Sequence, residues 1–125
     1  LDVLGRPDEA HEARRLGVAN AEHRLEINPD DVRALYMAAN GLVALGDRVR
    51  GRQWADRALA LAPDDSMVLY NLGCIYSMLG ETQLALECLE KAVVAGLRLR
   101  GWYEHDSNLD PVRREPRFEA LMKSL

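Results

Sequence analysis

Three side chains near the end of the sequence are of types that can bind a metal ion or transfer a proton. His105, Asp106 and Asp110 lie close together along the chain. Imidazole and carboxylate groups beside a turn could converge on one ion or form the acid-base pair of a hydrolase. Alternatively, Asp106 and Asp110 cap short helical turns, because an aspartate side chain accepts hydrogen bonds from unpaired backbone N–H groups. We favour capping and predict no metal site, no cofactor and no catalytic residue.

The remaining candidates for chemistry are two cysteines and two further histidines. Cys74 and Cys88 have neither the spacing of a zinc-ligand pair nor that of a redox CxxC motif, which favours two reduced thiols. His11 and His23 are too far apart on a polar helix to share a ligand set and are expected to face solvent. The sequence also lacks a glycine-rich phosphate loop, an HExxH motif and a nucleophile elbow. An enzyme is therefore not the expected class.

The composition is that of one folded domain. The 125 residues are 48% hydrophobic and 29% charged, with a formal net charge of -4. This charge argues against nucleic acid and anionic membranes as partners, and we find no signal peptide or transmembrane segment. We expect a cytoplasmic protein. Because the sequence begins at Leu1 without a methionine, we interpret it as part of a longer chain.

An internal repeat indicates how the elements are organised. A shift of 34 residues superposes a Pro-Asp-Asp turn at 29–31 on another at 63–65, and also superposes several apolar and small positions. A period of this size is typical of stacked supersecondary units. The other matched pairs are Leu35 and Leu69, Tyr36 and Tyr70, Leu45 and Leu79, Gly46 and Gly80, and Ala58 and Ala92.

Each repeat unit is predicted to be a helix hairpin. Leu69, Leu72 and Tyr76 follow helical spacing, and Gly80 then interrupts the helix before a second one begins. The second helix has apolar residues three and four positions apart. Pro29 and Pro63 each stand before a unit and cannot extend the preceding helix. The aspartates that follow each proline can cap the first helix of the next unit.

These residues resemble the tetratricopeptide repeat. The pattern of that family appears in one unit as Leu69, Leu72, Gly73, Tyr76, Ala85, Leu89 and Ala92, and in the preceding unit as Leu35, Ala38, Ala39, Leu42, Gly51, Ala55, Ala58 and Pro63. The resemblance implies an all-α fold, a right-handed superhelix of antiparallel helix hairpins. Gly73 and Ala85 are expected to be small because the helices of the hairpin cross there.

The two ends of the chain depart from the regular repeat. Residues 1–29 are predicted to be an incomplete repeat with one long helix from about Pro7 to Ile27, whose close-contact seam is Ala13, Gly17 and Ala21. Residues 30–63 and 64–97 are the two full repeats. Residues 98–125 show no echo of the period and are predicted to form a short helical C-terminal cap, with a last helix from Pro116, because a repeat stack would otherwise expose an apolar face.

The tail resembles the end of the tetratricopeptide regions of bacterial multidomain signalling proteins, among them nucleotide cyclases, protein kinases and transcription regulators. The residues that carry this resemblance are Trp102, Asp106, Leu109, Asp110, Pro111, Arg113, Pro116, Arg117, Phe118 and Leu121. It implies a signalling or scaffold role without identifying the activity.

The family resemblance implies protein binding in a concave groove formed by the first helix of each unit. The implied groove residues are Arg33, Tyr36, Asn40, Val43, Met67, Tyr70, Asn71, Cys74, Ser77 and Met78. Tyrosine offers amphipathic contact area and asparagine can bond a peptide backbone, so the expected partner is a peptide or a helix of another protein. With Cys74 in the groove and Cys88 on the outer face, no disulfide is expected.

A second interpretation assigns the contact surface to the first helix. Its hairpin partner is missing, so a second copy or another part of a parent protein could cover a face containing Ala10, Ala13, Gly17 and Ala21. The chain would then be a dimerisation or regulatory packing segment. The third and least favoured class is a hydrolase or metalloenzyme acting through His105.

Overall fold

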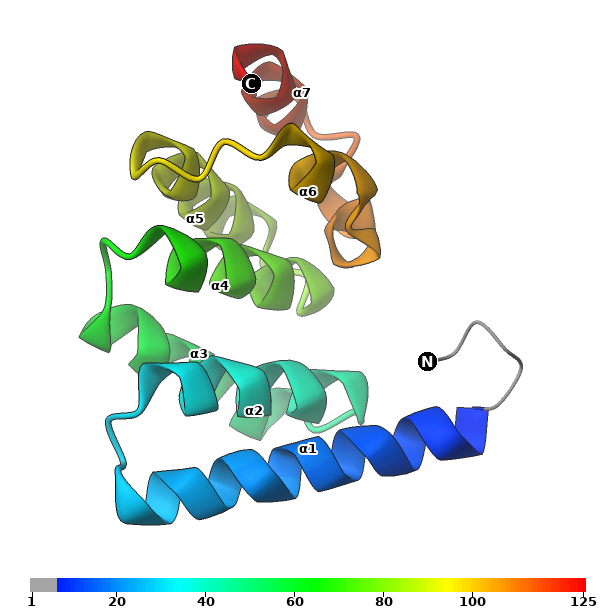
Figure 1. Cartoon of the computed structure of the whole chain (residues 1–125). Helices are drawn as coiled ribbons and strands as arrows, with labels where there is room; N and C mark the ends of the chain where they lie inside the picture. Colours follow the sequence, from blue (N-terminus) through cyan, green and yellow to red (C-terminus); the bar gives the residue numbers. More distant parts are fainter. Residues whose placement is uncertain (1–6) are drawn as a thin grey trace. The chain divides into compact units, whose positions relative to one another are not determined.

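The computed structural model describes residues 7–125, and within that range every regular element is a helix (Figure 1). The start of the predicted incomplete repeat, residues 1–6, lies outside the described residues. The elements are α1 (Pro7–Ile27), α2 (Val32–Ala44), α3 (Arg48–Leu61), α4 (Ser66–Met78), α5 (Thr82–Val94), α6 (Arg100–His105), the 3₁₀-helix η2 (Ser107–Val112) and α7 (Pro116–Ser124). The predicted all-α, tetratricopeptide-like fold is confirmed, and α1 and α7 begin where the sequence places them.

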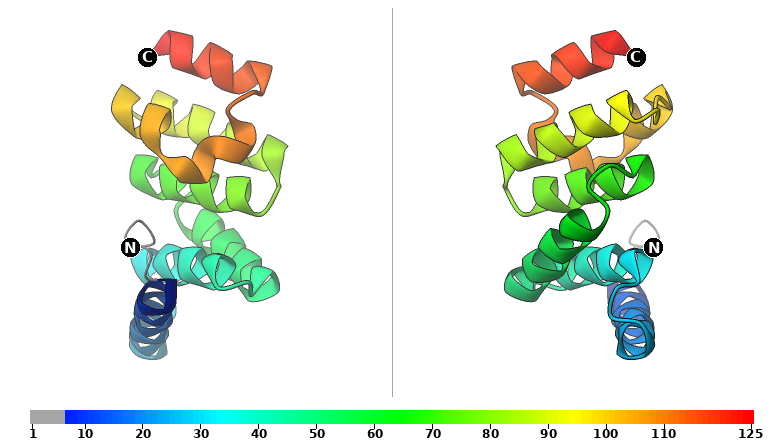
Figure 2. Two further views of the ribbon diagram at one scale, coloured as in Figure 1. Left: turned by 90° about the vertical axis from the view of Figure 1, so that its right-hand side faces the viewer. Right: turned by 90° about the vertical axis from the view of Figure 1, so that its left-hand side faces the viewer.

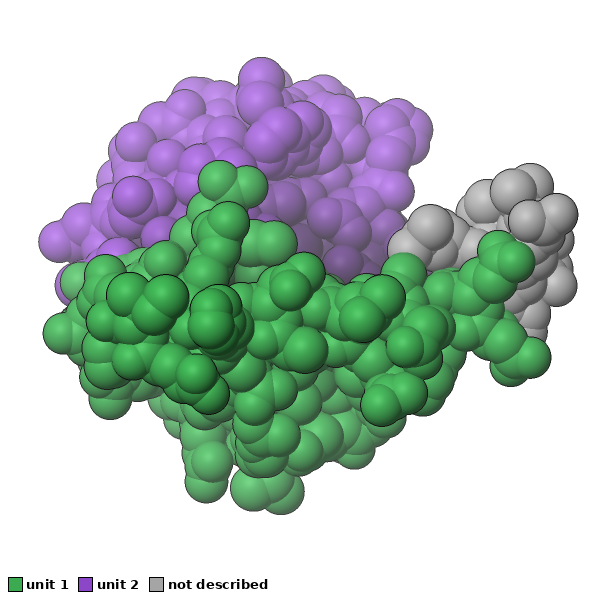
Figure 3. Space-filling model, turned by 60° about the horizontal axis from the view of Figure 1, so that its bottom comes forward, with its two compact units in different colours: residues 1–61 green, residues 62–125 purple. Residues whose placement is uncertain are grey.

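The helices belong to two compact units, coloured separately in Figure 3. Unit 1 ends at Leu61 and contains α1, α2 and α3, and unit 2 runs from Ala62 to Leu125 and contains the remaining helices. In unit 1, α2 packs against both α1 and α3. In unit 2, α4 and α5 form a hairpin, and the cap, residues 98–125, covers it.

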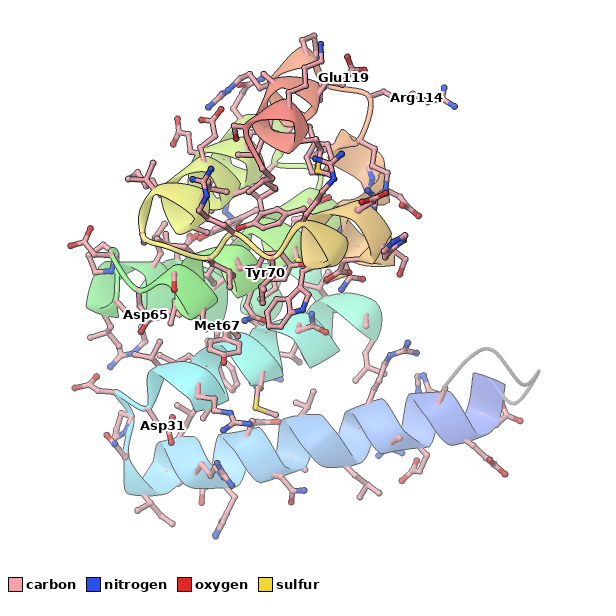
Figure 4. The ribbon with its side chains drawn as sticks, turned by 45° about the horizontal axis from the view of Figure 1, so that its top comes forward. Asp31, Asp65, Met67, Tyr70, Arg114 and Glu119 are labelled. Atoms are coloured by element: carbon pink, nitrogen blue, oxygen red, sulfur yellow. The ribbon has the colours of Figure 1, made fainter. Side chains whose placement is uncertain are left out.

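Aspartate caps set the start of the first helix in each hairpin (Figure 4). Asp31 Oδ1 accepts a hydrogen bond of 3.1 Å from the N–H of Ala34. Asp65 Oδ1 accepts bonds of 3.0 and 3.1 Å from the N–H groups of Met67 and Val68. These bonds satisfy N–H groups that have no partner inside the helix, so the Pro-Asp-Asp turns position α2 and α4 as predicted.

Glycines in the left-handed region end α2, α4 and α5. Gly46 and Gly80 have φ of 98° and 78°, which a side chain with a Cβ rarely adopts. At the first of these ends, the N–H of Asp47 bonds the carbonyl of Leu42 at 2.8 Å, which closes a Schellman motif. Gly96, with φ of 114°, ends α5 in the same way. Each hairpin turn is therefore encoded locally.

The α4–α5 hairpin closes over a glycine. A Cβ built on Gly73 would lie 2.7 Å from Leu89 Cδ2 and 3.4 Å from the carbonyl oxygen of Ala85. Leu89 and Ala85 are themselves fully buried. The prediction that small residues mark this helix crossing is confirmed, because any side chain at position 73 would push α4 and α5 apart.

The contact between α1 and α2 differs from the prediction. The small residue is on α2, where a Cβ on Gly41 would lie 2.5 Å from Val18 Cγ2. Val18 and Ala21 are buried, whereas Ala13 and Gly17 are exposed, so the predicted seam is wrong for these last two residues. A seam through Val18 lies about 100° around the helix from a seam through Gly17, because consecutive residues of an α-helix are rotated by about that angle.

An aromatic residue and an ion pair link α1 to α3 within unit 1. Trp54 packs with Leu25 against a buried cluster of small side chains. The Arg50 guanidinium lies 5.2 Å from the centre of the Trp54 ring, and its Nη2 is 3.1 Å from Glu22 Oε2. The small residues of the cluster are Ala21, Ala34 and Ala38.

The cap forms a second layer on the hairpin of unit 2. Element contacts join η2 to α4 and α5, and α7 to α5 and α6 (Figure 2). Its buried side chains are Tyr103, Leu109, Val112, Phe118 and Leu121. Pro116 occupies the first turn of α7, where its missing N–H has no cost. These side chains supply the apolar contact that the predicted cap role requires.

Candidate partner-binding surface

Tyr70 connects the hairpin of unit 2 to the cap. Its Oη lies 2.9 Å from Asp106 Oδ2 and 3.0 Å from the carbonyl oxygen of Trp102, so its single proton is shared between two acceptors. The ring is buried, with its centre 5.5 Å from that of Trp102 and 5.1 Å from that of Tyr103. Such tilted and edge-to-face pairs are favourable arrangements of aromatic rings.

Asp106 accepts hydrogen bonds on both carboxylate oxygens. Oδ1 accepts a 3.0 Å bond from the N–H of Asn108, which caps η2 as predicted. Oδ2 accepts from Tyr70 and, at 3.5 Å, from Cys74 Sγ. One carboxylate thus starts η2 and also holds α4.

No group of three potential ligands converges among residues 7–125. Asp110 does not cap a helix, contrary to prediction; its Oδ1 accepts a 2.7 Å bond from Arg113 Nε. His105 is exposed at the end of α6.

Two arginines explain much of the tail motif. Arg113 donates to the carbonyl oxygens of Tyr103 and Asp106 at 3.0 and 2.6 Å, which ties α6 to the segment after η2. Arg117 forms two bonds to Glu90, of 2.5 and 3.2 Å, which ties α7 to α5. The tail residues therefore hold the cap together and fix it to the hairpin.

A pocket of about 440 Å³ lies on unit 2 between α4 and α6. We call it the α4–α6 pocket. Met67 and Trp102 at its rim are 40% and 42% exposed, whereas Tyr70 is buried at its wall. Asn71 Nδ2 donates to the carbonyl of Met67 at 2.7 Å, and the amide oxygen Oδ1 is the acceptor on this side chain. The lining residues are Met67, Tyr70, Asn71, Gly101, Trp102, His105 and Asp106.

The predicted groove residues are distributed between buried and open positions. In unit 2, Met67, Tyr70 and Asn71 meet at the α4–α6 pocket, while Cys74 and Ser77 are buried and Met78 is half-buried. In unit 1, Arg33 on α2 is exposed, Tyr36 and Asn40 are half-buried and Val43 is buried. Burial of Tyr70 and Cys74 follows from their bonds to Asp106 in the cap. Sequence reasoning assigned them to the groove because their bonding partner lies outside the repeat pattern.

Sequence reasoning also missed Tyr103. Its side chain is fully buried, and its Oη donates a 2.7 Å bond to the carbonyl oxygen of Leu97. Its neighbour Trp102, which is prominent in the tail motif, is the more exposed of the two. The tyrosine follows Trp102 directly in a segment without repeat periodicity, and no spacing signal distinguishes which of the two faces the core.

Both cysteines are free thiols in the structure, and both are buried. Burial, followed by the charge of Asp106, raises the pKa of Cys74 well above its ordinary value. Burial also raises the pKa of Cys88 to about 11. The prediction that Cys88 faces outward is wrong, because its side chain packs inside the α4–α5 hairpin unit.

Because of these two buried thiols, we expect the protein to lose stability at alkaline pH. The unfolded thiols ionise near pH 8.5, whereas the folded ones stay neutral, so protons are released on unfolding. The contribution of the neutral thiols to the free energy of unfolding is fully present below that pH. It falls as the pH rises above it, by about 1 kcal/mol per pH unit for each thiol. Urea unfolding from pH 7.5 to 9.5 measures this loss. A Cys74→Ala, Cys88→Ala variant should show a flatter profile, and an equal slope in both proteins would contradict the assignment.

Comparison with known proteins places the repeat on these elements. The family model of the tetratricopeptide repeat matches residues 54–87, which run from within α3 to within α5. Neither a curated protein nor a solved structure shows significant similarity to the chain. In the described part of the chain, no helix is both long enough and apolar enough to span a membrane.

Proposed function

We propose that this chain, which carries a tetratricopeptide repeat at residues 54–87, binds an extended peptide or a helix of a partner protein. Tetratricopeptide repeats are typically protein–protein interaction modules without catalytic activity of their own. The tail motif fits a scaffold in a cytoplasmic, bacterial-type signalling protein.

The observation that carries the proposal is the α4–α6 pocket. Met67 and Trp102 leave apolar surface open to solvent beside the amide of Asn71. Exposed apolar surface combined with an oriented polar group is typical of a recognition site. A partner residue would insert between the two apolar side chains while its backbone N–H bonds Asn71 Oδ1.

The exposed side of α2 in unit 1 is proposed as a second contact surface. Arg33 is exposed there, with Tyr36 and Asn40 half-buried on the same helix. Met37, which is 49% exposed, adds apolar area. A tyrosine and an asparagine can form amphipathic and hydrogen-bonding contacts with a peptide.

A double substitution in the pocket tests the proposal. Met67→Ala with Asn71→Ala should lower the affinity for a partner by about tenfold or more, because contact residues often contribute over 1 kcal/mol each. The partner is identified by cross-linking mass spectrometry, and affinity is measured by calorimetry. The melting temperature should change little, since Met67 is exposed and Asn71 bonds only its own helix in the described structure.

A matched control uses exposed apolar residues away from the pocket. Val49 and Val94 are 70% and 88% exposed, and alanine at both should leave binding unchanged. Undiminished binding by the folded Met67, Asn71 variant would reject the pocket. Loss of affinity that merely follows loss of helix content would reject it equally.

The second candidate is self-association through α1. Leu16 and Ile27 are 58% and 76% exposed on this helix, and exposed apolar side chains favour a covered state. Ala10 and Ala21 are buried within the chain, so the dimer face would centre on Leu16 and Ala13 instead. Light scattering after size exclusion tests it: a dimer that Leu16→Glu converts to monomer supports this candidate, and a monomer at high concentration excludes it.

A further inference from the structure

The α4–α6 pocket combines an aromatic wall with a carboxylate. Trp102 is 42% exposed, and its ring lies next to the buried ring of Tyr70, with 5.5 Å between the ring centres. The side chain of Asp106 lines the same pocket. The lining residues include no lysine or arginine, and Asp106 is the acidic residue among them. This combination of rings and a negative charge is selective for a cation.

The carboxylate is held in place before any partner arrives. Its oxygens accept bonds from the N–H of Asn108 at 3.0 Å and from Tyr70 Oη at 2.9 Å. The guanidinium of Arg113 donates from Nη2 to the backbone carbonyl oxygen of Asp106, while its Nε pairs with the carboxylate of Asp110. That guanidinium is therefore paired with a different carboxylate, while the carboxylate of Asp106 bonds side chains of α4 and belongs to a residue that lines the pocket.

We propose that the α4–α6 pocket takes an arginine side chain of the partner segment, a refinement that rests on the proposed function. The guanidinium plane stacks on the indole of Trp102 and is attracted by Asp106, while its methylenes contact Met67. Arginine suits the site because its planar cation is weakly hydrated and stacks on aromatic faces. An acidic side chain would be repelled by Asp106.

A pair of peptides that differ only in charge tests the proposal. The probes are acetyl-Gly-Ala-Arg-Ala-Gly-amide and the same peptide with citrulline, the neutral isostere of arginine. In NMR titrations the arginine peptide should shift the indole N–H of Trp102 and the amides of α4 and α6. It should bind at least about fivefold more tightly than the citrulline peptide, as a cation–π contact with a nearby carboxylate implies.

Substitutions at two positions locate the effect. Trp102→Leu keeps apolar area but removes the π surface, so the preference for arginine over citrulline should fall to within about twofold. His105→Lys places a positive charge at the pocket and should weaken binding of the arginine peptide by about fivefold. His105→Gln should leave its binding unchanged. Melting temperatures verify that each variant is folded.

The outcomes separate the inference from the proposed function. Equal binding of both peptides, or arginine-dependent shifts that avoid α4 and α6, would overturn the arginine site. If a partner then loses affinity with the Met67→Ala, Asn71→Ala protein, the pocket still binds protein and only the anchor is wrong. If neither peptide nor any partner responds to changes in the pocket, both proposals fail.

Discussion

Gly73→Leu is expected to lower the free energy of unfolding by about 3 kcal/mol or more. The new side chain would begin within 2.7 Å of Leu89 Cδ2, and a backbone carbonyl, that of Ala85, stands behind it at 3.4 Å. Leu89 is fully buried and has little room to move, so α4 and α5 must separate. Urea unfolding followed by circular dichroism measures the loss.

Gly17→Leu is the matched control for that substitution. Gly17 is also inside a helix, but among the described residues no atom outside its own stretch of helix lies within 4 Å of a Cβ built there. Leucine is a better helix former than glycine, so the control should gain up to about 1 kcal/mol. A Gly73→Leu protein as stable as the control would mean that the α4–α5 crossing is not close-packed.

Asp106→Ala is expected to cost about 2–4 kcal/mol. The substitution removes the N-cap of η2 and the shorter of the two hydrogen bonds of Tyr70 Oη. It also removes the acceptor of the Cys74 thiol. Calorimetric melting should show a lower transition temperature, and hydrogen exchange should show faster exchange in η2 and in the facing part of α4.

Two further variants control for charge and position. Asp106→Asn keeps one acceptor oxygen, which can serve the cap or Tyr70 but not both, and it should lose about half as much stability. Asp110→Ala removes an exposed carboxylate from the same segment and should cost under about 1 kcal/mol, because its ion pair with Arg113 is at the surface. Equal losses at positions 106 and 110 would contradict the bridging role of Asp106.

The hairpins were predictable because their signals are local. Asp31 and Asp65 act on N–H groups two or three residues away, and Gly46 and Gly80 end helices through bonds to the preceding turn. The long α1 was predictable for a similar reason, since Pro7 favours a helix start and no further proline follows before Ile27.

Long-range pairings were not predictable from spacing alone. The rotation of α1 depends on Val18 fitting over Gly41, and its sequence pattern would equally suit a seam through Gly17. The candidate site shows the same limit. Met67 and Asn71 were identified by their place in the repeat, but the bond from Tyr70 to Asp106 joins the repeat to a segment without periodicity. Tyr70 and Cys74, which both bond Asp106, are therefore buried although the repeat pattern assigned them to an open groove.

The Tyr70–Asp106 bond also has a consequence for synthesis on the ribosome. Its two residues are 36 positions apart, so at about 5–20 residues per second the tyrosine emerges roughly 2–7 s before its acceptor. Tyr70 and Cys74 then lie uncovered on a helix that its local signals already allow to form. During this interval the tyrosine ring and the thiol, which the folded unit buries, stay exposed to solvent, and slower synthesis of the chain should prolong that exposure.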